Sequence, residues 1–403
     1  MEIETLAWLR TTEGDRLLVH AAQAWADHSG DPVRVAAVVR RLEPDAEKAA
    51  AATTQAQLRA KAVVKFGSDA HRMFFTPDAL EQATRARVAE HRASRLAAAI
   101  PGGSVIVLGG GIGGVVLAFS RAGLVAAGVD ADPVRAEMAR ANLEALGLPG
   151  AVHAGDATAV DPSGFDAAFA DPARRGGRGR VFDVEGWTPP WPWVLDLLTR
   201  RSLVKVAPGI GHDLVPPGVE AEWVSDGGDV KEAVLWSPSL STTDRRATVI
   251  PSSAPGQPPG GLATLTDEDA PQLGEGDVDV RPVGAFLYEP DGAVIRAGLV
   301  TAVAAGVEGG LVDEHIAYVT SDASFRTPFA RGYRVVEQLP YREKQLRAAL
   351  HERGIGRLAI KKRGVQVVPE ELRKRLSLKG DNEGTLVLTR VAGQGTALLV
   401  EPF

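Results

Sequence analysis

Apolar and polar positions follow two different periods along this chain of 403 residues. In the first hundred residues, apolar side chains recur at the three- and four-residue spacing of one helix face. The residues that show this spacing are Leu17, Leu18, Ala21, Ala24 and Trp25. Further along, Phe74-Phe75-Thr76-Pro77 predicts an extended segment that leads into a helix over about residues 78–99, with Thr76 as its N-cap. The pattern therefore predicts a helical region over residues 1–98.

From Ser104 onward the apolar residues form short runs without alternation, which is the pattern of parallel strands covered on both faces. Helical segments separate these runs, as in a doubly wound sheet. We expect an α/β fold, with a Rossmann-like doubly wound sheet over residues 99–250 and an antiparallel hairpin at its edge. The predicted strands are 104–108, 125–129, 151–154, 167–170, 202–206 and the hairpin pair 221–224 and 232–236.

The C-terminal third differs in composition. Residues 251–284 are acidic and rich in Pro and Gly, which predicts a linker or long loop beside a short strand at 247–250. Residues 285–330 are expected to form a connecting α/β segment, and residues 331–403 a small α/β domain. The helices predicted in this part are 293–307 and 341–353, and the strands are 357–361, 385–390 and 397–401.

The composition excludes several kinds of site. The chain has no cysteine, so it has no disulfide framework, thiolate metal site or cysteine nucleophile. Its eight histidines lack the spacing of metal ligands, and we expect no bound metal. No apolar run approaches the ~20 residues that cross a bilayer, and the N-terminus lacks the pattern of a secretory signal. We expect a soluble, cytoplasmic protein with no membrane partner.

Charge is distributed unevenly. The formal net charge is −6, yet residues 331–380 contain 14 Lys and Arg against 5 Asp and Glu, a net charge of +9. The remainder of the chain therefore carries −15. A basic module on an acidic body predicts a polyanionic partner for that module.

The first predicted strand runs directly into a glycine loop, Gly109-Gly110-Gly111-Ile112-Gly113-Gly114. Glycines are needed at such a turn because side chains would keep the backbone away from a ligand and disfavour positive φ angles. The position suits a nucleotide. The spacing fits both GxGxG and GxGxxG, so the loop alone does not identify which nucleotide it binds.

Three aspartates end successive predicted strands. Asp130 closes the second strand, where its carboxylate could accept hydrogen bonds from ribose hydroxyls. Asp156 follows the third strand and could accept a bond from an adenine amino group. Asp171, followed by Pro172, ends the fourth strand beside the crevice of the sheet. The carboxyl ends of these strands are thus predicted to surround one ligand.

With these motifs the chain resembles class I S-adenosylmethionine-dependent methyltransferases, and more narrowly the bacterial members with a THUMP-like C-terminal domain. The segments that carry the resemblance are Phe74-Phe75-Thr76-Pro77, Gly111-Ile112-Gly113-Gly114, Asp130-Ala131-Asp132-Pro133, Gly155-Asp156-Ala157, Asp171-Pro172-Ala173-Arg174-Arg175, Tyr288-Glu289-Pro290-Asp291, Arg296-Ala297-Gly298-Leu299 and Ile360-Lys361-Lys362-Arg363-Gly364. They cover most of the chain. This combination is more specific than the glycine loop.

The resemblance implies S-adenosylmethionine as the cofactor, with the loop glycines near its methionine part. The cofactor-binding residues that it implies are Thr76, Gly109, Gly111, Gly113, Asp130 and Asp156. Asp171 and Pro172 would face the transferring methyl group, and in relatives that modify nucleic acids such a pair orients the target base. Ala173 and Arg174 replace the Pro and aromatic residue of enzymes that methylate exocyclic amines. A ring nitrogen, a ring carbon and the ribose therefore stay open as acceptors.

The basic module indicates a polyanion, and the resemblance to proteins with a THUMP-like domain implies that this polyanion is RNA. The arginines that follow Pro172 could bind phosphate bidentately; they are Arg174, Arg175, Arg178 and Arg180. Two basic clusters, 361–363 and 373–375, could lie on one face and attract a nucleic-acid backbone. The substrate-binding candidates are Arg174, Arg175, Lys361, Lys362 and Arg363. We expect a methyltransferase that acts on a nucleotide in structured RNA, either tRNA or rRNA.

Two alternatives stay open. An FAD- or NAD-dependent oxidoreductase is one, because the sequence VIVLGGGIGG is close to a flavoprotein loop. That reading leaves Asp156 and Asp171 without a role. The other alternative is a non-catalytic RNA-binding protein with a decayed cofactor pocket, because Val107 and Val115 replace acidic residues that are common in this class of methyltransferase.

Overall fold

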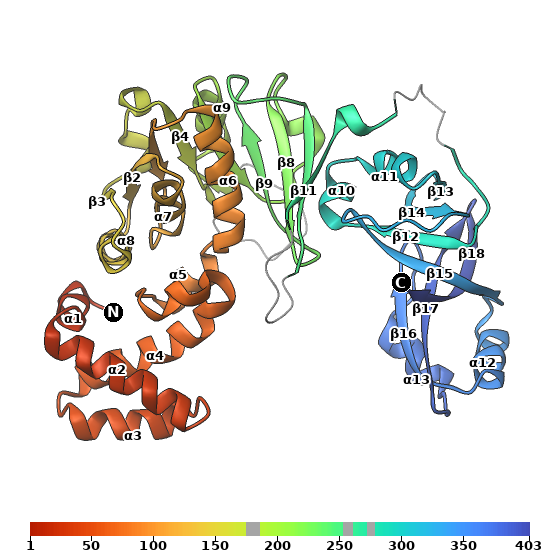
Figure 1. Cartoon of the computed structure of the whole chain (residues 1–403), viewed down its shortest axis with the longest axis horizontal. Coiled ribbons are helices and arrows are strands. Elements are labelled where there is room, and N and C mark those ends of the chain that lie inside the picture. The colour runs from red at the N-terminus through yellow and green to blue at the C-terminus, as the bar shows by residue number, and fades with distance from the viewer. Residues whose placement is uncertain (175–185, 253–260, 272–278) are drawn as a thin grey trace. The chain divides into compact units, whose positions relative to one another are not determined.

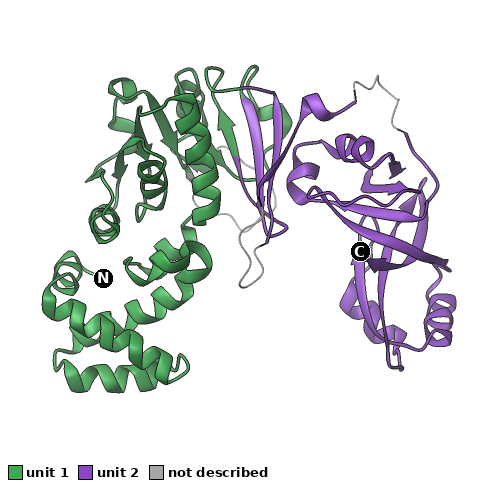
Figure 2. Cartoon of the chain, in the orientation of Figure 1, with its two compact units in different colours: residues 1–219, 234–241 green, residues 220–233, 242–403 purple. Residues whose placement is uncertain are grey.

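The computed structural model describes residues 1–174, 186–252, 261–271 and 279–403. These residues form two compact units (Figures 1 and 2). Unit 1 contains residues 1–219 and 234–241, and unit 2 contains residues 220–233 and 242–403. Strand β9 (Asp229–Trp236) contributes to both, since its first half belongs to unit 2 and its second half to unit 1.

The N-terminal part of unit 1 is helical, as its apolar spacing predicts. Its helices are α1 (Ile3–Leu9), α2 (Thr12–Asp27), α3 (Pro32–Leu42), α4 (Ala46–Phe66), α5 (Pro77–Gln82) and α6 (Ala86–Ala99). Side chains of Thr11, Asp31 and Asp45 cap the first turns of α2, α3 and α4 by accepting backbone hydrogen bonds. These caps satisfy amide groups that a helix leaves without an internal partner.

The expectation of one continuous helix over residues 78–99 is wrong. The chain leaves α5 at Ala83, whose backbone is extended, and α6 begins only at Ala86. Lys65 stabilises the end of α5, because its Nζ donates to the backbone oxygens of Leu80, Glu81 and Ala83 at 2.7–2.8 Å. A cation at a helix C-terminus satisfies the last carbonyl groups and interacts favourably with the helix dipole.

Two buried amide side chains fix the extended segment before α5. Gln55 of α4 donates to Phe75 O and accepts from Phe75 N, at 2.7 and 3.0 Å. Asn142 accepts from Phe74 N at 2.7 Å, and donates to Phe74 O and Ile112 O. The N-terminal helices and the glycine loop are therefore tied to the same short segment.

The centre of unit 1 is the Rossmann-like sheet that the sequence predicts (Figure 1). Five parallel strands lie in the order β7-β4-β1-β2-β3, and the second half of β9 (Asp229–Trp236) neighbours β7. The five strands are β1 (Ser104–Leu108), β2 (Val125–Asp130), β3 (Ala151–Ala154), β4 (Ala167–Ala170) and β7 (Ser202–Val206). The helices between them are α7 (Gly114–Arg121), α8 (Pro133–Leu146) and α9 (Trp191–Leu198). A short pair, β5 (Ala173–Arg174) and β6 (Trp187–Thr188), follows β4.

Unit 2 begins with the predicted hairpin, in which β8 (Glu220–Asp226) turns into β9 through Gly227 and Gly228. Both glycines have positive φ angles, as a tight hairpin turn requires. β10 (Arg245–Ile250) pairs parallel with β8, and β11 (Ala263–Thr266) pairs antiparallel with β10. The sequence did not indicate β11, which lies within the Pro/Gly-rich stretch.

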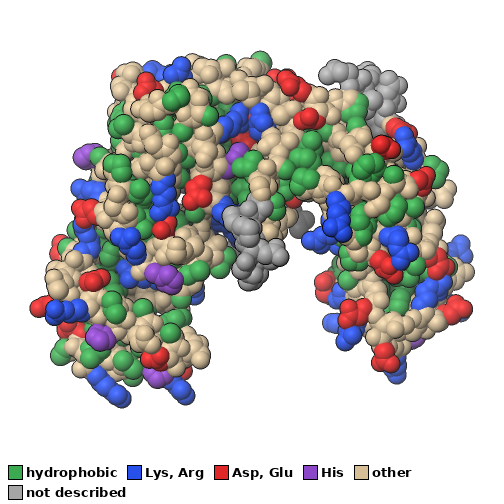
Figure 3. Space-filling view, viewed as in Figure 1, with side chains coloured by type: hydrophobic (Ala, Val, Ile, Leu, Met, Phe, Trp, Pro, Cys, Tyr) green, Lys and Arg blue, Asp and Glu red, His purple; other side chains and the backbone are tan. Residues whose placement is uncertain are grey.

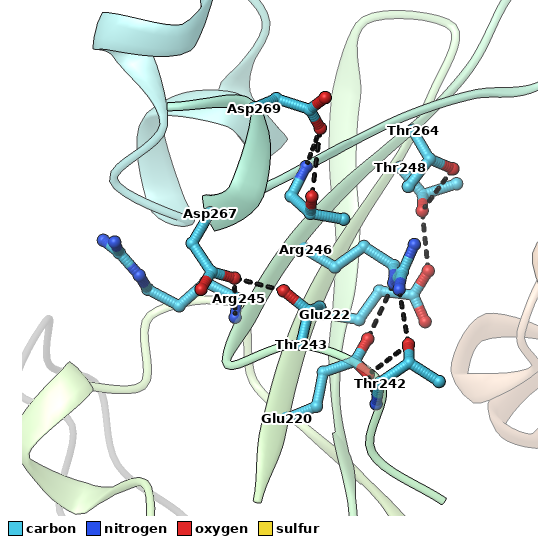
Figure 4. A network of polar contacts seen from close by, with 11 residues as sticks. Glu220, Glu222, Thr242, Thr243, Arg245, Arg246, Thr248, Thr264, Asp267 and Asp269 are labelled. Atoms are coloured by element: carbon cyan, nitrogen blue, oxygen red, sulfur yellow. Dashed lines mark hydrogen bonds and ion pairs between the residues drawn. The ribbon is translucent and has the colours of Figure 1, made fainter. Parts of the chain in front are cut away.

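Figure 4 shows the polar network that stabilises these strands. Glu220 is fully buried and accepts from Arg246 Nε at 2.7 Å and from Thr242 N at 2.9 Å. Glu222 is also buried and accepts from Thr248 Oγ1 at 2.6 Å. Hydrogen bonds of this kind offset the cost of burying a carboxylate. The network accounts for the burial of Glu220 and Glu222, two of the three acidic residues of β8.

The rest of unit 2 contains a seven-stranded sheet in the order β13-β14-β12-β15-β18-β17-β16. Its strands are β12 (Phe286–Pro290), β13 (Gly310–Asp313), β14 (Ile316–Ser321), β15 (Ala330–Leu339), β16 (Ile355–Lys362), β17 (Asn382–Val391) and β18 (Gln394–Pro402). Its helices are α10 (Gly292–Arg296), α11 (Val300–Gly306), α12 (Glu343–Glu352) and α13 (Pro369–Leu376). β16 and β17 are parallel, whereas the other neighbours are antiparallel. Residues 285–330 thus supply three strands of the same sheet.

The two faces of this sheet bury separate apolar clusters. Leu346 and Leu372, from α12 and α13, pack with Leu358 of β16 on one face. Tyr318 and Tyr333 belong to the cluster on the other face. Alternate residues of β16 consequently point to different environments.

Candidate active site

A cavity of about 560 Å³, which we call the unit 1 cavity, lies at the carboxyl ends of the parallel strands of unit 1. This volume is in the usual range for a small-molecule site. The lining includes loop residues 109–112, Asp130, Asp156 and Asp171, so the structure brings together the three predicted strand-end aspartates. α5 and the break after it supply Ala79, Gln82, Ala83 and Thr84.

Asp130 holds the glycine loop in place. Its Oδ2 accepts from Gly111 N at 2.7 Å, and its Oδ1 accepts from Asp132 N at 3.0 Å. Gly111 has a φ of +53°, and a Cβ atom there would have no protein atom within 4 Å. The missing side chain therefore leaves space for a ligand. A carboxylate has about four acceptor positions, so Asp130 keeps capacity for a ligand hydroxyl.

Gly113 has a different role from Gly111. A Cβ atom at Gly113 would come within 3.0 Å of Ala139 Cβ on α8. This glycine therefore allows the start of α7 to pack closely against α8. Its predicted contact with a ligand stays a prediction.

Asp156 lines the cavity from the turn after β3. Its Oδ1 accepts from both the backbone N and the Oγ1 of Thr158, each at 2.8 Å. These hydrogen bonds lower the pKa of the Asp156 carboxyl group because they favour its ionised form. The side chain thus presents a negatively charged acceptor to the cavity.

Asp171 forms an ion pair with Lys205, a residue that belongs to none of the sequence motifs described above. Lys205 Nζ lies 2.7 Å from Asp171 Oδ2, and both residues line the cavity. Lys205 is the only incompletely buried residue of β7. A lone lysine in a short apolar strand was the available sequence signal, but it does not reveal the partner.

Other predicted residues lie around this cavity in different ways. Thr76 caps α5 by accepting from Ala79 N, and it lines a neighbouring cavity of about 600 Å³. Val107 is fully buried in the apolar core. Val115, on the first turn of α7, lines the unit 1 cavity. Pro172 follows Asp171 and is half-buried.

The basic candidates have separate environments. Lys361 pairs with Glu289 of β12 at 2.6 Å, while Arg363 Cζ lies 5.5 Å from the ring centre of Tyr318. Lys362 is exposed. The backbone of Arg174 forms part of β5, and Arg175 lies outside the described residues. Phosphate binding by Arg174 and Arg175 therefore stays a prediction.

The expectation that the clusters 361–363 and 373–375 share one face is wrong for Lys361 and Arg363, while the two-residue period of β16 places Lys362 on the same face as Leu358. Arg373 donates to Leu358 O, and Arg375 pairs with Glu343 of α12. Both contacts lie on the helix-covered face of the sheet, whereas Lys361 and Arg363 contact residues of the opposite side. The two-residue period of β16 separates them.

Lys361 and Arg363 line a separate cavity of about 730 Å³ within unit 2. Arg326 and Arg331 also line it, together with Phe325 and Phe403. We call this the unit 2 cavity. Figure 3 shows cationic and acidic side chains intermingled over the visible surface, so this face of the molecule is not uniformly basic despite the net charge of +9 of residues 331–380.

In the part of the chain that the structure describes, no three His, Asp or Glu residues are grouped as a metal site would require. A search of the same residues found no helix long and apolar enough to span a membrane.

Comparisons with known proteins agree on one family. Curated proteins from two strains of Mycobacterium tuberculosis, each described as an uncharacterised S-adenosylmethionine-dependent methyltransferase, are 38% identical over 326 residues. That alignment covers 79% of this chain and 84% of the relative. A crystal structure assigned as a methyltransferase of Porphyromonas gingivalis W83 covers 96% of this chain and 98% of its own, with a TM-score of 0.75 and 21% identity. It supports the fold.

Two family models match parts of the chain. One, described as THUMP domain-like, matches residues 330–402. The other, described as a domain of unknown function, matches residues 2–62. The first match begins and ends with the strands β15 and β18.

Proposed function

Because this chain belongs to the S-adenosylmethionine-dependent methyltransferases, with a THUMP-like C-terminal domain, we propose that it methylates a nucleotide in structured RNA, either tRNA or rRNA. The cofactor is S-adenosylmethionine. The proposal includes a cytoplasmic location, where this cofactor and RNA are both present. An oxidoreductase activity receives no support from the M. tuberculosis relatives.

The unit 1 cavity fits the cofactor. The space beside Gly111, which a Cβ atom would fill, gives room for a ligand against the loop backbone. Asp130 and Asp156 supply carboxylate acceptors for the ribose hydroxyls and the adenine amino group. When bound, the cofactor supplies an electrophilic methyl group on a sulfonium. The contribution of the protein is then to orient the acceptor, and no covalent enzyme intermediate is required.

Asp171 and Pro172 are proposed to meet the acceptor. The Asp171 backbone lies directly behind the glycine loop, since a Cβ atom at Gly109 would be 3.6 Å from Asp171 O. Its side chain lines the same cavity as the loop. A carboxylate at this position can orient an N–H or O–H group, or accept its proton.

The observation that carries the RNA assignment is the unit 2 cavity. Arg326, Arg331 and Arg363 line it and form no ion pair with any described acidic residue. Arginine is well suited to phosphate because its planar guanidinium group donates two parallel hydrogen bonds. Phe325 and Phe403 add aromatic surface on which a base could stack. Cations and aromatic rings together are typical of nucleic-acid sites.

The test is methyl transfer from labelled S-adenosylmethionine to unmodified transcripts of tRNA and rRNA. We expect label in RNA, and loss of at least 100-fold in rate for Asp171→Ala. The matched control is Asp161→Ala, because Asp161 also pairs with a cation, Arg200 at 3.6 Å, but does not line the unit 1 cavity. Label in proteins or small molecules but not in RNA would refute the RNA assignment.

A further inference from the structure

Strands β4 and β7 place a carboxylate and an ammonium group side by side at the end of the sheet. The two strands pair in parallel, with Ala170 opposite Val204. The next residues, Asp171 and Lys205, are therefore also opposite each other. Their side chains meet with 2.7 Å between Lys205 Nζ and Asp171 Oδ2.

Both groups remain accessible to a ligand in the unit 1 cavity. The side chains of Lys205 and Asp171 are 19% and 31% exposed, and both line the cavity wall that also contains the glycine loop. An ammonium group donates three protons, and a carboxylate has about four acceptor positions. The single bond between them leaves donor and acceptor capacity on adjacent atoms.

We propose that Lys205 and Asp171 together bind the lactam edge of a guanine or uracil, and that the methyl acceptor is its ring nitrogen. A lactam presents an N–H group next to a carbonyl oxygen. The N–H donates to Asp171 while the carbonyl oxygen accepts from Lys205. This inference rests on the proposed RNA methyltransferase function and specifies its acceptor.

Charge selects the lactam over other acceptors. Adenine and cytosine also place a donor beside an acceptor, but methylation of a neutral nitrogen develops positive charge next to the Lys205 ammonium. A lactam nitrogen must instead lose its proton, which leaves negative charge on the carbonyl oxygen beside that ammonium. Preorganised charge of this kind stabilises a transition state strongly in a partly enclosed site. A ribose hydroxyl presents one atom and cannot use both groups in the same way.

The step balances with the residues present. Asp171 accepts the ring N–H proton, and Lys205 stabilises the resulting charge on oxygen. The nitrogen then forms a bond to the methyl carbon, and the sulfur that releases this carbon keeps the electron pair of the broken bond. The methylated base is neutral, and Asp171 releases its proton to solvent.

The product analysis tests this directly. Unmodified tRNA and rRNA transcripts are methylated, digested to nucleosides and separated with mass detection. We expect 1-methylguanosine or 3-methyluridine. Methyl groups on adenosine, cytidine, the guanine amino group or ribose would overturn the lactam assignment and leave the RNA function intact. Absence of methyl groups in any RNA would overturn both.

Variants of Lys205 test its part in the reaction. We expect Lys205→Met to reduce the turnover rate by about 10- to 100-fold, the loss of a charge-assisted hydrogen bond, with unchanged affinity for S-adenosylmethionine. Lys205→Arg keeps the charge and should restore part of the rate. The control is Lys231→Met, because Lys231 also pairs with an aspartate, at 3.0 Å, and is 23% exposed, yet does not line the cavity. Equal losses in both Met variants would refute the assignment.

Discussion

At the scale of single residues, Asp130 links the fold to cofactor binding. Its carboxylate positions Gly111 and so shapes the loop that we propose to contact the cofactor. We predict that Asp130→Asn weakens S-adenosylmethionine binding by about 10- to 100-fold, because an amide group provides a weaker acceptor and turns an N–H toward a backbone donor. Isothermal titration calorimetry measures the change. Asp161→Asn is the control, and an equal loss in that variant would contradict the prediction.

Thr158 favours the ionised form of Asp156, the second carboxylate that we propose to bind the cofactor. Its two hydrogen bonds lower the pKa of Asp156, so the ionised group persists to more acidic pH than an ordinary aspartate, whose pKa is about 3.9. Because the folded-state pKa is depressed, its stabilising contribution is present above the unfolded value and is lost as pH falls through the folded value. We predict that Thr158→Ala raises the pKa toward 3.9 in a carbon-detected NMR titration. Ser163→Ala, which removes the corresponding hydroxyl bond to Asp161, should leave Asp156 unchanged.

At the scale of elements, the segment before α5 couples stability to the site. Asn142 makes three buried hydrogen bonds, two to Phe74 and one to Ile112 of the glycine loop. We predict that Asn142→Ala lowers the free energy of unfolding by about 3 kcal/mol, because buried backbone groups lose their partners. Cofactor affinity should also fall.

Gln55→Ala is the matched comparison for Asn142→Ala. It removes two buried bonds to Phe75 but does not touch the loop. Denaturant unfolding should therefore show a loss of stability in both variants, while calorimetry under folded conditions shows weaker cofactor binding only for Asn142→Ala. Equal cofactor affinities in the two variants would exclude the proposed coupling.

The elements also show what the sequence could reveal. Strands β1 to β4 and β7 were predictable because unbroken apolar runs and strand-end aspartates are local signals. The break between α5 and α6 was not, since residues 82–85 contain neither Gly nor Pro and the stabilising cation is Lys65, about fifteen residues earlier. The Asp171–Lys205 pair was missed for a similar reason. Strand register, rather than sequence distance, brings its members together.

At the scale of the whole molecule, the net charge of residues 331–380 has to be weighed against the acidic side chains that pair with its basic residues. Of the basic residues in 331–380, Arg334, Arg353 and Arg357 pair with glutamates, and Lys361 does so as well. Such pairs neutralise charge that a count along the sequence attributes to a polyanion site. The cations that we propose to bind RNA are therefore Arg326, Arg331 and Arg363 of the unit 2 cavity, for which the structure shows no acidic partner among the residues that it describes.

This distinction predicts a difference in salt dependence between two groups of arginines. The variant Arg326→Ala/Arg331→Ala/Arg363→Ala removes three cavity cations. It should reduce the slope of log K against log salt by about 2 to 3, since each lost phosphate contact contributes about 0.7 on a single strand and about 0.9 on a duplex. The control Arg334→Ala/Arg357→Ala removes cations paired with Glu401 and Glu383, and the slope should change little. RNA affinity at four or more salt concentrations measures both. Because Asp130 and the other proposed cofactor-binding residues belong to unit 1, affinity for S-adenosylmethionine should be the same in both variants. A reduced slope in the control, or an unchanged slope in the cavity variant, would show that RNA binds elsewhere.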